Sequence, residues 1–442
     1  MTTCETCGKE FTRAAALEKH KGNKRPCKAP TQLIQQALLG AGVEVGEFRT
    51  VSKNFNATTS KEDRAKEGIF FTPKKARDLL MAKVAETGIQ PTVILEPSFG
   101  SGEFIHDARA AYPDAHILGV EKNETLFKTV KCSDSRLSCT DFLRWTGRAD
   151  LIIGNPPYFL MEGEKKQYDC MTGRPNIYVL FLYKCLQEHL EPGGVLAFIL
   201  PTSLYNCSYY QPMRDYIKEN TIIRYLETLN KPGFYETGQE TMLIVLQKQK
   251  GADEYIFRPK SGYTYITPFY KELYEVTRDT TTLRQLGLGV KTGNVVWNQE
   301  KEKLADEGTL LIYSSNINNC ELKLNNLLGS NKKQYVKGIK KPTLDGPVIL
   351  VERGYGNSFS FNSVLVTLKG FYAENHLNVI YAKTAGSEGN LQKVMESFKD
   401  ERSIKFIRWF LGNGSMTSTD LETTMPIFLD TVIVENGSST SV

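Results

Sequence analysis

Residues 93–102 read Val-Ile-Leu-Glu-Pro-Ser-Phe-Gly-Ser-Gly, an apolar run followed by a turn-forming segment. The apolar run predicts a buried strand. Gly100 and Gly102 allow the backbone to turn sharply and to approach a ligand closely. The residues that follow, 103–111, predict an amphipathic helix. A strand, a glycine-rich turn and a helix in this order indicate the start of an α/β unit.

Apolar strands and amphipathic helices alternate on both sides of this segment. We predict strands at 92–96, 115–121, 151–154, 194–200, 222–226 and 241–246, and helices at 74–87, 103–111 and 176–189. This rhythm is typical of a doubly wound α/β fold with a sheet of parallel strands. Because such sheets bind ligands at the carboxyl ends of their strands, the residues at those ends are the candidates for a site.

Three of these strand ends carry residues suited to a nucleoside. Glu121 follows the glycines by about twenty residues, where an acidic side chain suits a ribose diol. Asp141 can accept a hydrogen bond from an adenine amino group, and Phe142 can cover the ring. A negative Glu96 under the turn would repel a pyrophosphate, and no Gly-Lys-Ser/Thr sequence indicates a P-loop. These features favour a cationic cofactor such as S-adenosylmethionine.

The fourth strand end is Asn155-Pro156-Pro157-Tyr158. The prolines lack an N–H, so the strand ladder stops there and the adjacent carbonyls are held at fixed angles. The Asn155 side chain and the Pro156 carbonyl can both accept from one amino group, and Tyr158 offers a flat face to a ring. This set suits a planar substrate with an amino group, such as adenine. The alternative is a plain strand-terminating turn.

Residues 66–250 resemble a DNA N6-adenine methyltransferase of the gamma-class motif order, as found in type II restriction-modification systems. In that class the cofactor motifs precede the catalytic motif and a target-recognition domain follows. Residues 68–73, Gly-Ile-Phe-Phe-Thr-Pro, resemble the motif that closes over the methionine end of the cofactor. Residues 193–201 resemble the strand and turn beyond the catalytic loop.

The resemblance implies two sets of site residues. The contacts to S-adenosylmethionine would be Thr72, Glu96, Pro97, Phe99, Gly100, Gly102, Glu121, Asp141, Phe142 and Asn155. The catalytic set would be Asn155, Pro156, Tyr158 and Phe234. In the implied mechanism, two acceptors at the loop hold the adenine N6 group and expose its lone pair to the methyl group. The base must leave the duplex to reach this loop, where Tyr158 and Phe234 would stack on it.

The N-terminal segment carries four side chains with metal-ligand spacing: Cys4, Cys7, His20 and Cys27. Phe11 and Leu17 fill the two apolar positions that a small ββα finger needs. Residues 1–30 therefore resemble a C2H2-type zinc finger in which a cysteine replaces the last histidine, and a Cys3His set is sound for zinc. Because so short a segment has little apolar area, we expect it to need a structural Zn²⁺ to fold.

The chain has 442 residues, which predicts two or three domains. We expect a zinc finger at 1–30, a helix and linker at 31–65, a Rossmann-like S-adenosylmethionine-dependent methyltransferase domain at 66–250, and a mixed α/β target-recognition domain at 251–442. The nine scattered cysteines do not suggest a disulfide framework, which favours an intracellular protein of the cytoplasm or nucleus. No apolar run is long enough to predict a membrane span or a signal peptide.

The net charge of +5 is concentrated in two places. Residues 1–30 hold seven Lys/Arg against three Glu, and a second cluster comprises Lys332, Lys333, Lys337, Lys340 and Lys341. Exposed lysines are commonly only solvated surface, but these could neutralise the phosphates of double-stranded DNA. The resemblance adds a cognate restriction nuclease as an expected partner, and we expect the chain to act as a monomer. Segments 288–294, 351–354 and 415–417 look like pieces of a recognition domain.

Two other classes of function remain open. The same loop chemistry serves enzymes that act on RNA bases, on cytosine N4 or on protein glutamine. A DNA-binding regulator with an inactive methyltransferase core is the second alternative. Cytosine C5 methylation is disfavoured, because it needs a cysteine nucleophile at this loop.

Overall fold

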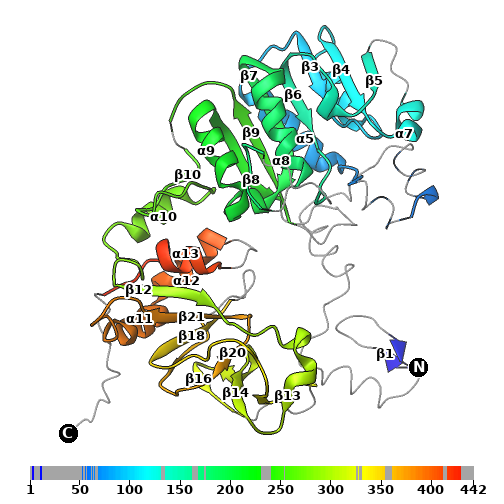
Figure 1. The fold of residues 1–442 in the computed structure, drawn as a ribbon. Coiled ribbons are helices and arrows are strands. Elements are labelled where there is room, and N and C mark those ends of the chain that lie inside the picture. Colours follow the sequence, from blue (N-terminus) through cyan, green and yellow to red (C-terminus); the bar gives the residue numbers. More distant parts are fainter. Residues whose placement is uncertain are drawn as a thin grey trace.

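The computed structural model describes residues 2–3, 10–11, 52, 55, 57–60, 62, 64, 68–130, 135–161, 168–173, 176–229, 240–252, 254–324, 327, 331–353, 361–411 and 416–429. Figure 1 shows an α/β domain, built on a large sheet, above a second domain of mixed strands and helices. The two lie against each other on the side where α9 and α10 are labelled.

The first domain contains a seven-stranded sheet with the order β5-β4-β3-β6-β7-β9-β8. Its strands are β3 (Val93–Glu96), β4 (His116–Glu121), β5 (Ser135–Cys139), β6 (Ala149–Gly154), β7 (Leu190–Pro201), β8 (Ile222–Leu229) and β9 (Thr241–Gln247). All pair in parallel except β9, which runs antiparallel to both β7 and β8. The strand order reverses between β3 and β6, and such a switch point is where open α/β sheets bind ligands.

Helices cover both faces of this sheet, and the sequence predicts the three at 74–86, 103–111 and 177–184. They are α5 (Lys74–Glu86), α6 (Glu103–Ala111), α7 (Glu124–Thr129), α8 (Ile177–Lys184) and α9 (Gln211–Asn220). Short turns are η1 (Phe142–Arg144), η2 (Cys185–His189), η3 (Thr202–Leu204) and η4 (Ser208–Tyr210). Residues of α5 and α6 pack in one core cluster with Val195 and Ile199, whereas α8 and α9 pack in another with Leu196 and Phe198. Strand β7 therefore buries alternate residues on opposite faces, as expected at the centre of a doubly wound sheet.

Part of the expected linker before this domain packs against it. Ser52 is fully buried, and its hydroxyl donates to Glu103 Oε1 at 2.5 Å and lies 2.8 Å from Ser101 Oγ. The ring of Phe55 lies edge-on to Phe71, with 5.9 Å between centroids. Two residues of the segment expected as a helix and linker are therefore buried against the domain. Single buried residues among polar ones produce no periodic pattern, so the sequence did not reveal them.

The C-terminal domain contains two four-stranded sheets. One is β12 (Leu288–Thr292), β21 (Leu377–Ala382), β18 (Val348–Glu352) and β19 (Ser363–Val366), paired antiparallel in that order. The other is β13 (Leu304–Ala305), β17 (Tyr335–Val336), β14 (Thr309–Ile312) and β20 (Tyr372–Ala373). Shorter pairs are β10 (Ile256–Phe257) with β11 (Tyr265–Ile266) and β15 (Ile317–Asn318) with β16 (Glu321–Leu322). Its helices are α10 (Tyr270–Thr277), α11 (Asn390–Lys399), α12 (Glu401–Leu411) and α13 (Ser418–Thr423).

Near the N-terminus, β1 (Thr2–Thr3) and β2 (Glu10–Phe11) pair antiparallel, with Thr2 opposite Phe11. The four expected zinc ligands lie outside the described residues. Within the part of the chain that the structure describes, no helix combines the length and apolarity needed to span a bilayer.

Candidate cofactor and substrate site

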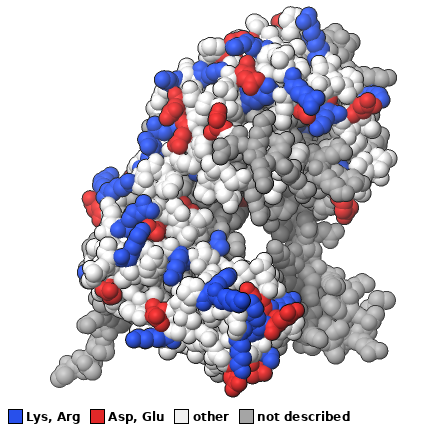
Figure 2. Space-filling view, in the orientation of Figure 1, with Lys and Arg blue, Asp and Glu red and all other residues white. Residues whose placement is uncertain are grey.

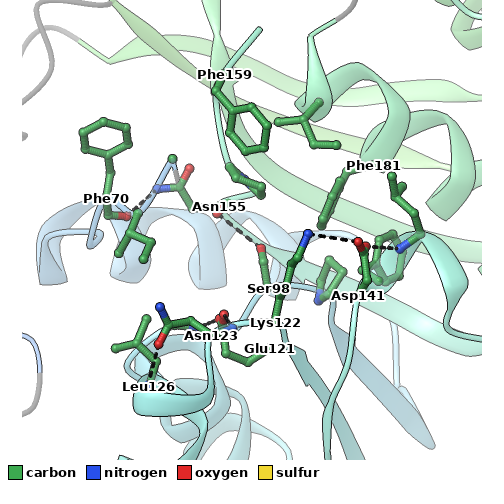
Figure 3. Close-up of a pocket in the computed structure, with 18 of the residues that line it drawn as sticks. Phe70, Ser98, Glu121, Lys122, Asn123, Leu126, Asp141, Asn155, Phe159 and Phe181 are labelled. Carbon is green, nitrogen blue, oxygen red and sulfur yellow. Dashed lines mark hydrogen bonds and ion pairs between the residues drawn. The ribbon is translucent and has the colours of Figure 1, made fainter. Parts of the chain in front are cut away.

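A cavity of about 630 Å³ lies beside the carboxyl ends of β3, β4 and β6. This volume is within the roughly 300–1,000 Å³ typical of small-molecule sites. Six predicted site residues line it: Pro97, Gly100, Glu121, Asp141, Phe142 and Asn155. Figure 3 shows four strand-end side chains, those of Ser98, Glu121, Asp141 and Asn155, around this one space. The structure thus brings the ends of separate strands together, as the sequence predicts.

Other predicted residues are buried without forming the lining: Thr72, Glu96, Phe99, Gly102, Pro156 and Tyr158. Phe234 belongs to residues 230–239, which lie outside the described part. The lining also contains Ile69, Phe70 and Phe71 from the expected cofactor motif at 68–73, and Ser98 from the glycine-rich turn. Residues that the sequence did not indicate are Lys122, Asn123, Leu126, Phe159, Ile177 and Phe181. Ile177 and Phe181 stand one helical turn apart on α8, and every residue from Ile177 to Leu182 is buried. Because this helix is apolar all round, its sequence could not indicate which side faces a ligand.

Glu121 ties the end of β4 to the glycine turn after β3. Its Oε2 accepts from the Gly100 N–H at 2.8 Å, and its Oε1 accepts from the Asn123 N–H at 2.7 Å. Gly100 and Gly102 have φ of +53° and +76°, which glycine adopts without strain. A carboxylate oxygen has more than one acceptor position, so Glu121 can support the turn and still accept from a ligand in the cavity.

Glu96 is 2% exposed, and burial raises the pKa of its carboxyl group well above the usual value, with Glu121 and Asp107 adding to the rise. A Cβ on Gly154 would lie 2.5 Å from Glu96 Oε1, so the glycine is what allows the carboxyl group this place. The raised pKa means that Glu96 is protonated more readily than a free carboxyl group, whereas the sequence argument took it as negative. A positive group nearby would favour its charged form.

We therefore expect the affinity for a cationic cofactor to rise with pH. Below the raised pKa of Glu96 the carboxyl group must lose a proton before it attracts a cation, whereas above that pKa it is already charged. Titration calorimetry at several pH values, in buffers of different ionisation enthalpy, should show proton release on binding. E96Q should abolish the release and flatten the pH dependence. Equal proton release in wild type and E96Q would contradict this role.

Asn155 is held by its amide nitrogen. Its Nδ2 donates to the Phe70 carbonyl at 3.2 Å and to Thr72 Oγ1 at 3.1 Å (Figure 3 draws the first of these). Because a carbonyl can only accept, the contact with Phe70 fixes which end of the amide is NH₂. Asn155 Oδ1 therefore faces away from these partners and accepts from the Tyr158 hydroxyl.

Tyr158 is 8% exposed and does not present an open face. Its hydroxyl also lies 2.6 Å from the Ile199 carbonyl, and its ring packs edge-on to Tyr178 with 6.0 Å between centroids. Burial raises the pKa of the Tyr158 hydroxyl well above its usual value, so the group stays protonated and can donate. The next residue, Phe159, lines the cavity instead, as Figure 3 shows.

The segment 68–72 packs directly on the loop of Asn155–Tyr158. A Cβ on Gly68, whose φ is +68°, would lie 2.8 Å from Pro157 Cβ and 2.9 Å from the Tyr158 nitrogen. Arg77 secures the other end of the segment, because its Nη1 donates to the Thr72 carbonyl at 2.6 Å. Arg77 also pairs with two acidic side chains of α6, Glu103 at 3.1 Å and Asp107 at 2.6 Å.

Asp141 and Phe142 form the far wall. Asp141 Oδ1 accepts from the Leu143 N–H at 3.0 Å and so caps η1, while its Oδ2 lies 3.1 Å from Lys122 Nζ. The Phe142 ring packs on Phe181, with 4.7 Å between centroids. One acidic oxygen thus has a structural role, and the two rings form an apolar wall suited to an aromatic ligand.

Three of the five clustered lysines are ion-paired. Lys332 pairs with Glu374 at 3.4 Å, Lys333 with Asp306 at 2.8 Å and Lys337 with Glu307 at 2.7 Å. Figure 2 shows acidic residues among the basic ones on this part of the C-terminal domain. The cluster is thus a mixed-charge surface at these positions, which weakens the expectation that it serves as a phosphate-binding patch.

Metal ligation finds no support among the described residues, which contain no group of three or more His, Cys, Asp or Glu side chains that could hold an ion. Cys4, Cys7, His20 and Cys27 are not among them, so the expected zinc site is outside the described part of the chain.

Comparison with known proteins finds a matching family and several similar proteins. Residues 105–234 match the Eco57I restriction-modification methylase model. The chain is 31% identical to the type II methyltransferase M.CvrRI of Paramecium bursaria Chlorella virus XZ-6E, over 86% of this chain and 99% of that protein. It is 30% identical to the modification methylase CviBIII of Paramecium bursaria Chlorella virus NC1A, over 87% of this chain and 100% of that protein. The crystal structure of the type I restriction enzyme EcoKI M protein overlaps with a TM-score of 0.34 at 18% identity, over 41% of this chain and 44% of that one.

Proposed function

This chain belongs to the type II methyltransferase family, and we propose that it transfers the methyl group of S-adenosylmethionine to N6 of an adenine flipped out of double-stranded DNA. The observation that carries the proposal is the orientation of Asn155. Its NH₂ group is anchored on Phe70 and Thr72, which leaves its oxygen as the acceptor at the end of β6. An oriented acceptor is what an exocyclic amino group requires.

The residues around the cavity fit an adenosine-bearing cation. Glu121 can accept from a ribose diol, and Phe142 with Phe181 can enclose an adenine ring. The carboxyl group of Glu96, whose pKa is raised by burial, lies beside Gly154 and is stabilised in its charged form when a positive group arrives. When bound, the cofactor supplies an electrophilic methyl group on its sulfonium sulfur.

The protein contributes orientation. Asn155 Oδ1 and the Pro156 carbonyl accept from the two N–H bonds of the amino group, which draws the nitrogen toward tetrahedral geometry and exposes its lone pair. These interactions strengthen as positive charge develops on N6, so they lower the barrier more than they stabilise the ground state. The Tyr158 hydroxyl holds the Asn155 oxygen in place, and Phe159 lines the space where a base can stack.

A methyl-transfer assay with labelled cofactor tests the proposal against its rivals. The substrates are duplex DNA, RNA and a glutamine-containing peptide, and the labelled DNA is digested to nucleosides. We expect the label in duplex DNA, and digestion should release it as N6-methyl-2′-deoxyadenosine. Label in N4-methylcytosine, in RNA or in peptide would support another substrate of the same core, and no transfer to any substrate would support an inactive regulator.

The C-terminal domain is our candidate for target recognition. Figure 2 shows a hollow between the two domains on the face drawn. Two segments that the sequence analysis singled out, 288–294 and 351–354, reach the same sheet, because β12 and β18 both pair with β21. We propose that this domain reads the DNA sequence. A cognate restriction nuclease remains an expected partner.

We also propose a structural zinc ion in residues 1–30. The paired strands β1 and β2 flank Cys4 and Cys7 in the sequence, which is the order of a ββα finger. Elemental analysis of protein purified without chelator should find about one zinc per chain. C7S should lose the metal, whereas C139S should keep it, because Cys139 is an exposed free cysteine of the catalytic domain. A wild-type protein that contains no zinc would contradict the proposed zinc site in residues 1–30.

A further inference from the structure

A buried polar network lies where the catalytic and C-terminal domains meet. Its centre is Arg214 on α9, whose side chain is 1% exposed. The guanidinium group donates to the carbonyls of Thr264, Leu204 and Cys207 and to Gln211 Oε1. A buried charge is costly unless it is hydrogen-bonded, and these four acceptors offset that cost.

The network continues into the C-terminal domain through Tyr265. The Arg214 guanidinium carbon lies 5.7 Å from the centroid of the Tyr265 ring. The Tyr265 hydroxyl donates to Asp420 Oδ1 of α13 at 2.9 Å, and its ring packs edge-on to Phe410 of α12. Asn206, in the turn segment that follows β7, donates to the Phe410 carbonyl at 3.3 Å. Helix α12 is therefore attached to the turn segment through Asn206, and α13 is connected to Arg214 through Tyr265.

The same segment reaches the catalytic loop from the other side. Arg214 donates hydrogen bonds to the carbonyls of Leu204 and Cys207, and Ser203 is the residue immediately before Leu204. Ser203 Oγ lies 2.9 Å from the Tyr178 hydroxyl, and the Tyr178 ring packs on Tyr158. The Tyr158 hydroxyl contacts Asn155 Oδ1. An unbroken series of contacts thus joins α13 to the amide that the proposed chemistry uses.

We infer that Arg214, acting through Tyr265 and Asp420, is a positioning residue that fixes the C-terminal domain relative to the catalytic loop, so that a target held by one is presented to the other. This role rests on the proposed function. The guanidinium group bonds to neutral acceptors from three separate stretches of chain, so it fixes where those stretches lie relative to one another. Small misplacements of a reacting group reduce rates steeply.

Y265F is the sharpest test, because it removes one hydroxyl and keeps the ring. We expect kcat on cognate duplex DNA to fall by about tenfold or more, while the cofactor Kd and the melting temperature change little. R214M should lose more activity than Y265F, and R214K, which keeps the charge, should recover part of the loss. Y263F is the matched control, because Tyr263 packs beside Tyr265 and makes no hydroxyl contact in the network. It should behave as wild type.

Small-angle scattering of the full chain provides a readout that needs no activity. We expect R214M and Y265F to broaden the distribution of inter-domain distances relative to Y263F. Unchanged kcat in Y265F, a fall in cofactor affinity parallel to the fall in kcat, or unchanged scattering in R214M would each overturn the positioning role. A wild-type protein that methylates no DNA would refute the proposed function instead, and the scattering result would still decide the role of Arg214.

Discussion

N155A should lose methyl transfer by about 10²–10³-fold in kcat, the loss seen when one oriented hydrogen-bonding group is removed from a transition state. The variant deletes the Oδ1 acceptor for the target amino group. The cavity wall around Glu121, Phe142 and Phe181 is not touched, so cofactor affinity measured by calorimetry should survive. The backbone of the loop should also persist, because its prolines and the close packing of Gly68 hold it.

Two further variants, N155D and N220A, test whether the loss of activity is specific to the Asn155 side chain. An aspartate keeps an acceptor oxygen, but it cannot donate to the Phe70 carbonyl and its charge repels that carbonyl. The kcat of N155D should therefore lie between those of wild type and N155A. Asn220 ends α9 and bonds only to the Tyr216 carbonyl among the hydrogen bonds described, so N220A should retain full activity. If N155A lost cofactor binding and transfer to the same extent, the catalytic role of Asn155 would be wrong.

E121A should weaken cofactor binding more than any other single change at the cavity. It removes the expected ribose acceptor and also releases the N–H groups of Gly100 and Asn123. A hydrogen bond to a charged group contributes about 1.5–3 kcal/mol, so loss of the ribose contact alone should weaken binding by roughly 10- to 100-fold.

Two comparisons separate the ribose contact from support of the turn. E121Q keeps one carbonyl oxygen but places an NH₂ group against an N–H donor, so it should also bind weakly. E86A removes an exposed acid of α5 that pairs with Lys83 and should bind normally. Unchanged affinity in E121A would rule out the ribose assignment. If E121A had a much lower melting temperature but normal cofactor affinity, the role of Glu121 would be only to support the turn.

Much of the catalytic domain could be predicted from the sequence because its signals are local. The apolar run of β7 predicts a strand buried on both faces, and all its residues from Val195 to Leu200 are fully buried. Glu121 and Asn155 follow such runs directly, and parallel strands bring their carboxyl ends to one edge. That reasoning needs only the strand period and the direction of the chain.

What the sequence could not predict depends on partners far along the chain. The burial of Tyr158 comes from Tyr178 and Ile199, and no pattern around residue 158 indicates either of them. The raised pKa of Glu96 comes first from its burial, to which the charges of Glu121 and Asp107 add. Arg214 resembles an ordinary exposed helix arginine in sequence, yet it is buried between two domains.

Sequencing of modified bases in DNA from cells that express this chain tests the central claim most directly. With the wild-type chain, N6-methyladenine should occur at one recurring sequence, and the same cells expressing N155A at equal protein level should lack it. DNA free of N6-methyladenine, or a mark on cytosine, would contradict the account.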